Sequence, residues 1–157
     1  MVFKGYLTGD AERYFWKKQK ETVIRVFVIG MLFLSPVFII TTIFSKSVLP
    51  LLVFSLAFPV GLFIFLFPKT KKEKQKALPK LIKIKKESLT SISDEHTETC
   101  FLEDVKYVYD HDDFYEIIFS MSKPNYYFIC QKSLIAKGTI EEFEELFESK
   151  IIRKKRD

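Results

Sequence analysis

Two histidines and two cysteines are the side chains of this sequence that most readily bind metal ions or act as nucleophiles. His96 and Cys100 are four residues apart, which suits two ligands on one face of a helix, but their segment is typical of a strand. We therefore expect no metal site there, and we expect Cys100 and Cys130 to be reduced and packed as small apolar side chains. A cysteine–histidine nucleophilic pair is the alternative, although no local motif indicates one.

Three aspartates, Asp110, Asp112 and Asp113, resemble a fragment of a calcium-binding loop. The glycine and the distant glutamate of a complete loop are missing, so we favour a solvated turn. The five glycines are not clustered, and no glycine-rich phosphate loop is present. The sequence thus predicts no cofactor, no bound metal and no catalytic residue.

Lysines form the third group of chemically informative residues, because 69–86 contains nine lysines and one glutamate. Beside a bilayer, anionic headgroups would be their nearest counter-charge. The expected headgroup contacts are Lys69, Lys71, Lys72, Lys74, Lys76, Trp16, Lys17 and Lys18. An aromatic ring followed by lysines suits the membrane interface, although the single tryptophan could instead anchor a protein partner.

Nucleic acid is not an expected partner, although the net charge of the chain is +5. Residues 87–157 hold nine basic and 16 acidic residues, a difference of −7, so the excess of positive charge comes from the segments nearer the N-terminus. The basic total therefore indicates a membrane edge and not a binding surface for a polyanion.

A long apolar stretch lies between the two basic segments. The only charged residue between Val26 and Pro68 is Lys46. It separates two uncharged runs, 26–45 with 20 residues and 47–68 with 22 residues. A hydrocarbon core of about 30 Å needs about 20 residues of helix, and apolar residues cover every side of the first run. The sequence predicts a transmembrane helical hairpin; the alternative is a pair of buried helices in a soluble protein.

The flanking charges predict the orientation of this hairpin. Residues 1–25 carry six Lys or Arg against three acids, 69–86 is strongly basic, and the connection offers only Lys46. Because Lys and Arg prefer the cytoplasmic side, we expect a multi-pass protein of the plasma membrane with both termini in the cytoplasm. A cleaved signal peptide is not expected, since the first run is long and a second run follows directly.

The remaining part of the chain alternates apolar and polar residues in short segments, which is typical of strands. The predicted strands are 81–85, 89–93, 97–102, 105–109, 114–121 and 126–131, with turns at 110–113 and 122–125. Thr139 and Glu142 form a capping-box pattern and predict the start of a helix, and Asp10 is a candidate cap near the N-terminus. The predicted apolar stripe of the later helix is Ile140, Phe143, Leu146, Phe147 and Ile151.

Antiparallel strands closed by one C-terminal helix follow the plan of a pleckstrin-homology (PH)-like domain. With the two apolar runs, the basic connector and the opening residues 3–8, the chain resembles the YcxB-like family of bacterial membrane proteins. The patterns that carry the resemblance are those of residues 82–84, 105–118, 127–132 and 139–147. The resemblance implies a membrane hairpin with a cytoplasmic PH-like domain, and it implies no activity and no functional residues.

The expected organisation is a cytoplasmic juxtamembrane segment (1–25), a transmembrane helical hairpin (26–68), a polybasic linker (69–79) and an α+β PH-like domain (80–157). Three function classes are compatible with it. The first is a membrane-tethered module whose domain docks a protein partner at the inner face of the bilayer. The second is a protein that binds anionic lipid, and the third is a small regulatory or immunity subunit of a larger membrane complex. We do not expect an enzyme.

Overall fold

A computed structural model describes residues 1–66, 75–120 and 126–153 of the chain. The chain divides into two compact units. One unit, called the domain below, consists of Met1–Phe15 together with Lys69–Asp157. The other, called the apolar unit, is Trp16–Pro68.

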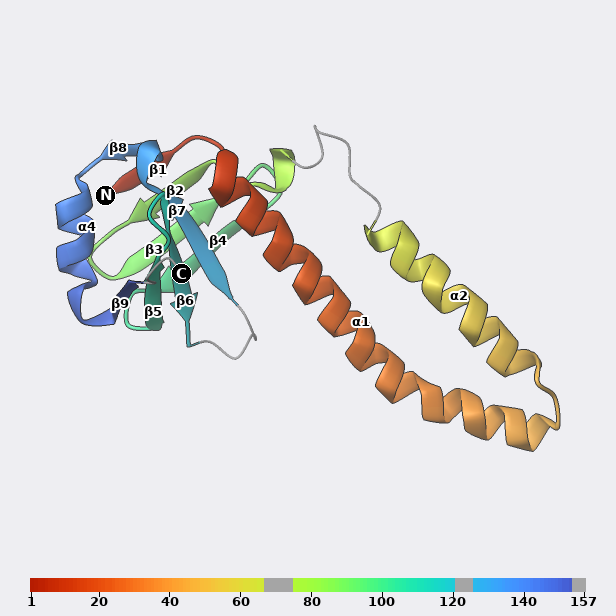
Figure 1. Cartoon of the computed structure of the whole chain (residues 1–157). Helices are drawn as coiled ribbons and strands as arrows, with labels where there is room; N and C mark the ends of the chain where they lie inside the picture. The colour runs from red at the N-terminus through yellow and green to blue at the C-terminus, as the bar shows by residue number, and fades with distance from the viewer. Residues whose placement is uncertain (67–74, 121–125, 154–157) are drawn as a thin grey trace. The chain divides into compact units, whose positions relative to one another are not determined.

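Two helices make up the apolar unit, and a short connection at Lys46 joins them (Figure 1). The first, α1, spans Gly9–Ser45 and begins within the domain, and the second, α2, spans Leu49–Leu66. Lys46 has a φ of 49°, a left-handed conformation that ends α1 and turns the chain. In the described part of the chain one helix, over residues 9–44, is long and apolar enough to cross a membrane.

The apolar side chains of α1 are exposed in the structure and not packed into a protein core. Leu32 is 68% exposed, Phe33 is 78% exposed and Ile43 is 69% exposed. A soluble protein rarely presents so much contiguous apolar surface to water. The sequence also predicts a second span over 47–68; α2 covers 18 uncharged residues of it, and residues 67 and 68 lie outside the described part.

Five strands form the first sheet of the domain, which we call sheet A. Its strands are β1 (Val2–Lys4), β2 (Leu81–Ile84), β3 (Ser88–Ile92), β4 (Thr97–Phe101) and β8 (Ile135–Lys137). The strand order is β4-β3-β2-β1-β8, and every neighbouring pair is antiparallel. The first strand of the chain therefore lies inside the sheet, between two strands that follow the apolar unit in the sequence.

Four strands form the second sheet, sheet B. They are β5 (Val105–Asp110), β6 (Phe114–Phe119), β7 (Tyr127–Gln131) and β9 (Ile151–Arg153), in the order β7-β6-β5-β9. The β5–β6 and β6–β7 pairs are antiparallel, but β9 runs parallel to β5. The expectation of purely antiparallel strands is thus wrong at this edge, because the chain returns to β5 after a helix, as parallel pairing requires.

A helix, α4 (Ile140–Leu146), precedes β9 and covers one end of the core. The predicted capping box is confirmed: the Thr139 hydroxyl accepts from the Glu142 amide, and the Glu142 carboxylate accepts from the Thr139 amide. Phe143 is fully buried, and its ring stacks on Tyr115 of β6 with centroids 4.4 Å apart. Apolar side chains from both sheets and α4 make one continuous core.

Several sequence expectations need correction. Leu146 lies in α4 but is 48% exposed, so it is not part of a buried stripe. Ile151 lies in β9 and not in the helix, because α4 ends at Leu146. Asp10 is the second residue of α1 and not its cap. Residues 1–15 form part of the domain and not a segment of their own, since β1 pairs with β2 and β8.

Candidate functional site

The basic residues expected at lipid headgroups lie in different parts of the structure. Lys69, Lys71, Lys72 and Lys74 fall outside the described residues. Lys76 is exposed, just ahead of β2. Trp16, Lys17 and Lys18 follow one another on α1, where Lys17 is exposed and the other two are half-buried. The structure therefore does not gather these side chains into a single described site.

The candidate nucleophiles and metal ligands also lie apart. Cys100 is buried beneath sheet A, whereas His96 is exposed in the hairpin before β4. Cys130 is fully buried, and burial raises the pKa of its thiol, which keeps it protonated and a poor nucleophile. Within the described residues, no group of three or more His, Cys, Asp or Glu side chains is placed to hold a metal ion.

The three clustered aspartates form a tight turn between β5 and β6. Asp112 has a φ of 64°, and its amide donates to the Asp110 carboxylate at 3.0 Å. Asp110 also pairs with Lys132 at 2.8 Å, and the Lys132 ammonium lies 4.3 Å from the centre of the Tyr115 ring. The turn is thus held by local hydrogen bonds and by one cation from the segment after β7.

A cluster that the sequence analysis does not predict lies on the outer face of sheet B, beneath the first turns of α1. Its centre is the carboxylate of Glu116 on β6, which is only 2% exposed. The Tyr14 hydroxyl donates to Glu116 Oε2 at 2.7 Å, and His111 Nε2 lies 3.4 Å from the same atom. The Tyr14 ring lies 4.9 Å from the His111 ring and 5.2 Å from the Phe114 ring.

A second polar contact fastens the same helix end to β7. The Thr8 amide donates to the side-chain oxygen of Gln131 at 2.9 Å, and the Gln131 amide group donates to the Thr8 hydroxyl at 3.1 Å. Ala11 is fully buried beside these contacts. Among the described residues of the domain, Glu116 and Gln131 are the buried carboxylate and the buried amide, and each meets a residue between Thr8 and Tyr14. The arrangement attaches the start of the apolar helix firmly to sheet B.

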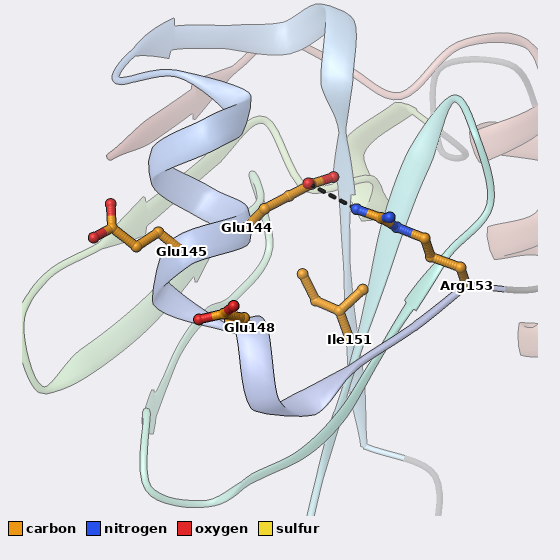
Figure 2. Close-up of a pocket in the computed structure, with 5 residues that line it drawn as sticks. All are labelled: Glu144, Glu145, Glu148, Ile151 and Arg153. Atoms are coloured by element: carbon orange, nitrogen blue, oxygen red, sulfur yellow. Dashed lines mark hydrogen bonds and ion pairs between the residues drawn. The ribbon is translucent and has the colours of Figure 1, made fainter.

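A hollow lies between α4 and β9. It has a volume of about 620 Å³ and is lined by Glu144, Glu145, Glu148, Ile151 and Arg153. Figure 2 shows Glu144 pointing to Arg153, with which it forms an ion pair at 3.0 Å. Glu145 points away from that pair on the side of α4. The described part of the lining is therefore acidic, with one apolar side chain and one paired cation.

One polar chain connects this hollow to the interior. The Tyr115 hydroxyl donates to Glu144 Oε1 at 2.8 Å, and the other oxygen of Glu144 accepts from Arg153. Burial, followed by the hydrogen bond to Glu144, raises the pKa of Tyr115 above its usual range. Glu144 therefore has a structural part in the hollow, whereas Glu145 and Glu148 are exposed.

Hydrogen bonding also shifts the pKa values of Lys80 and Asp94, an ion pair next to the start of β2. The Lys80 ammonium donates to the Asp94 carboxylate, which raises the pKa of Lys80 and lowers the pKa of Asp94. Both groups are open to solvent, so the pair holds the β3–β4 hairpin near β2 without forming a reactive site.

Comparisons with protein-family models, with curated proteins and with solved structures found no match to this chain.

Proposed function

We propose that this protein is a membrane-tethered interaction module. In this proposal a helical hairpin, 26–45 and 47–68, anchors a PH-like domain at the inner face of a bacterial plasma membrane, where the domain docks a protein partner. Both termini lie in the cytoplasm, and the protein catalyses no reaction. The YcxB-like resemblance is part of the proposal, since it implies the same combination of hairpin and domain.

One observation carries the membrane topology. The segments before and after the apolar unit fold together, because β1 lies between β2 and β8 in one sheet. A chain that leaves a folded domain through an apolar segment and returns to the same domain must cross a bilayer an even number of times. Two crossings fit the two uncharged runs and the single intervening lysine.

The same observation argues against removal of the N-terminus as a signal sequence. Cleavage after α1 would take β1 out of the middle of sheet A and remove Phe3, which is 2% exposed. It would also remove Tyr14 and Thr8, which donate hydrogen bonds to the buried side chains of Glu116 and Gln131. The domain therefore needs the residues that precede the apolar unit.

The hollow between α4 and β9 is the surface that we assign to the protein partner. Its exposed carboxylates, Glu145 and Glu148, offer charge to a basic segment, and Ile151 offers an apolar contact. Leu146 and Ile152, at the ends of α4 and within β9, are also exposed, at 48% and 38%. Exposed apolar residues among charges are typical of the rim and core of a protein interface.

The test uses the full-length chain, because a fragment that starts at residue 78 lacks β1. In intact cells, a membrane-impermeant thiol reagent should label Ser47→Cys, whereas Ser133→Cys, an exposed position of the domain, should react only after permeabilisation. Native Cys100 and Cys130 are buried and give little background. Labelling of Ser133→Cys in intact cells would contradict the orientation.

The second arm asks whether the hollow binds the partner. Proteins are cross-linked in membranes and purified with the tagged chain for the wild type, for Glu145→Lys/Glu148→Lys and for Glu103→Lys. A partner should be retained by the wild type and by Glu103→Lys, an exposed acid outside the hollow, and lost by the double variant. Equal recovery from all three proteins would exclude the hollow as the docking site.

A further inference from the structure

The outer face of sheet A carries lysines and no acidic side chain at its strand positions. Neighbouring residues in the register share a face, so Lys83 of β2, Val2 of β1 and Lys137 of β8 form one row across the sheet. The row continues through Thr90 and Thr99, whose hydroxyls are 3.1 Å apart. We call the outer side of sheet A the lysine face.

Alternation along the strands adds two lysines to the lysine face. Phe3 is buried in the core, so Lys4 at the next position of β1 points outward. Ile84 is likewise buried, and Lys85 follows it. Phe101, which pairs with Ser88 at the far end of the face, is 59% exposed. The face thus presents Lys4, Lys83, Lys85 and Lys137, all exposed, with hydroxyls and one exposed aromatic ring between them.

These lysines differ from three other basic residues of the domain. Lys80, Lys132 and Arg153 each form an ion pair with a described carboxylate. Within residues 1–66, 75–120 and 126–153, the structure shows no ion pair for the four lysines of the lysine face. Four exposed cations on one face, without a described carboxylate paired to them, form a local excess of positive charge that can attract an anionic surface.

We propose that the lysine face docks onto the anionic headgroups of the bilayer that holds the apolar helices. The occupant is a lipid surface, because the same chain places one within reach: α1 begins five residues after Lys4, and β2 begins 13 residues after the apolar unit ends at Pro68. Tethering raises the effective concentration of that surface far above that of any free polyanion. This inference rests on the membrane attachment in the proposed function, but it does not depend on a protein partner.

The composition of the face supports lipid over other anions. Lysine stems and an exposed phenylalanine suit the boundary between headgroups and acyl chains, where apolar carbon and cationic nitrogen are both accommodated. Each lysine near a bilayer rich in anionic lipid should change the ratio of docked to undocked domain about fivefold. Reversing the charge of one lysine should therefore change the ratio roughly 25-fold.

The experiment places a spin label at Thr99→Cys of the full-length protein in nanodiscs. One set of discs contains only phosphatidylcholine, and the other contains 30% phosphatidylglycerol. The label should lose access to a water-soluble nickel reagent in the anionic discs, and 1 M NaCl should restore access because it shortens the screening length to about 3 Å. A label at Ser133→Cys, outside the lysine face, should be equally accessible in both.

Charge variants then identify the cause of the protection. Lys83→Glu should abolish the effect of phosphatidylglycerol and Lys83→Gln should weaken it, whereas Lys106→Glu, an exposed strand lysine of sheet B, should leave it intact. Intact burial of Cys100 and Cys130 checks that each variant is folded.

Three outcomes would overturn the inference. Equal access at Thr99→Cys in both kinds of disc would exclude lipid docking while leaving the membrane tether standing. Protection by an added DNA oligonucleotide, but not by phosphatidylglycerol, would assign the face to a different polyanion. A chain that does not remain with the discs at all would refute the tether itself, and with it the docking of the lysine face.

Discussion

The outer faces of the two sheets of the domain have opposite chemistry. Sheet B is covered by the first turns of α1, and it buries Glu116 together with Ile129, each 2% exposed. The outer face of sheet A is open over Val2, Lys83, Thr90 and Thr99, with lysines that pair with no described acid. The first turns of α1 cover the outer face of sheet B, whereas the lysine face is exposed.

The difference in charge and burial between the two outer faces separates a stabilising face from an exposed face. A carboxylate can be buried on sheet B because a hydroxyl from Tyr14 satisfies it and an imidazole adjoins it. The lysine face meets no such groups among the described residues, so water or an external anion solvates its ammonium groups. The outer face of sheet B therefore contributes to stability, whereas that of sheet A is available for binding.

The largest expected effect comes from a matched pair of isoleucines on the two outer faces. Ile129→Ala on sheet B removes a buried side chain and should lower the free energy of unfolding by about 2–4 kcal/mol. Ile92→Ala, on the half-buried outer side of β3, should cost less than about 1.5 kcal/mol. In detergent micelles, the reaction rate of the buried thiols of Cys100 and Cys130 reports opening of the domain.

A similar decrease in the free energy of unfolding for Ile129→Ala and Ile92→Ala would contradict the difference between the two faces. It would mean that the outer side of sheet A is covered as completely as that of sheet B, even in the isolated protein. The lysine face could then not be a surface that docks reversibly.

Local sequence patterns were sufficient to predict the strands of four to six residues and the start of α4. Segments such as 81–84 and 105–110 alternate over four or more residues, and the Thr139 capping box is a purely local motif. The three strands β1, β8 and β9 were not predictable in this way. Each has three residues, too few for a periodic signal, and each is stabilised by neighbours distant in the sequence.

The cluster around Glu116 was not predictable for a related reason. Glu116 alternates with Tyr115 and Ile117, which is typical of a strand with one face in water. Tyr14, which covers it, precedes it by 102 residues and lies beyond the whole apolar unit. The net excess of lysine was visible in the sequence, but the lysine face depends on a register that brings Lys4, Lys83 and Lys137 together.

A smaller effect is expected from the hydroxyl that covers the buried carboxylate. Tyr14→Phe removes the donor at 2.7 Å from Glu116 and leaves the ring contacts in place, so the domain should lose about 1–2 kcal/mol of stability. Tyr107→Phe is the control, because this tyrosine of sheet B is 40% exposed and should change stability by less than about 0.5 kcal/mol. The rate at which the buried thiols of Cys100 and Cys130 react measures the stability of both variants.

Equal stability of the two phenylalanine variants would show that the Tyr14 hydroxyl does not hold the helix start on sheet B. The rings of His111 and Phe114 would then account for the attachment, and their substitution should produce the larger loss.

The smallest expected effect on stability belongs to the lysine face. Lys83→Gln in detergent micelles free of anionic lipid should leave the free energy of unfolding within about 0.5 kcal/mol of the wild type, since the side chain is exposed and pairs with no described acid. In micelles doped with phosphatidylglycerol, the wild type should become more stable than Lys83→Gln, because a ligand that binds only the folded state raises its stability by mass action. A loss of stability in neutral micelles would place Lys83 in the fold itself, and the contrast between the two faces would then reflect packing and not an external anion.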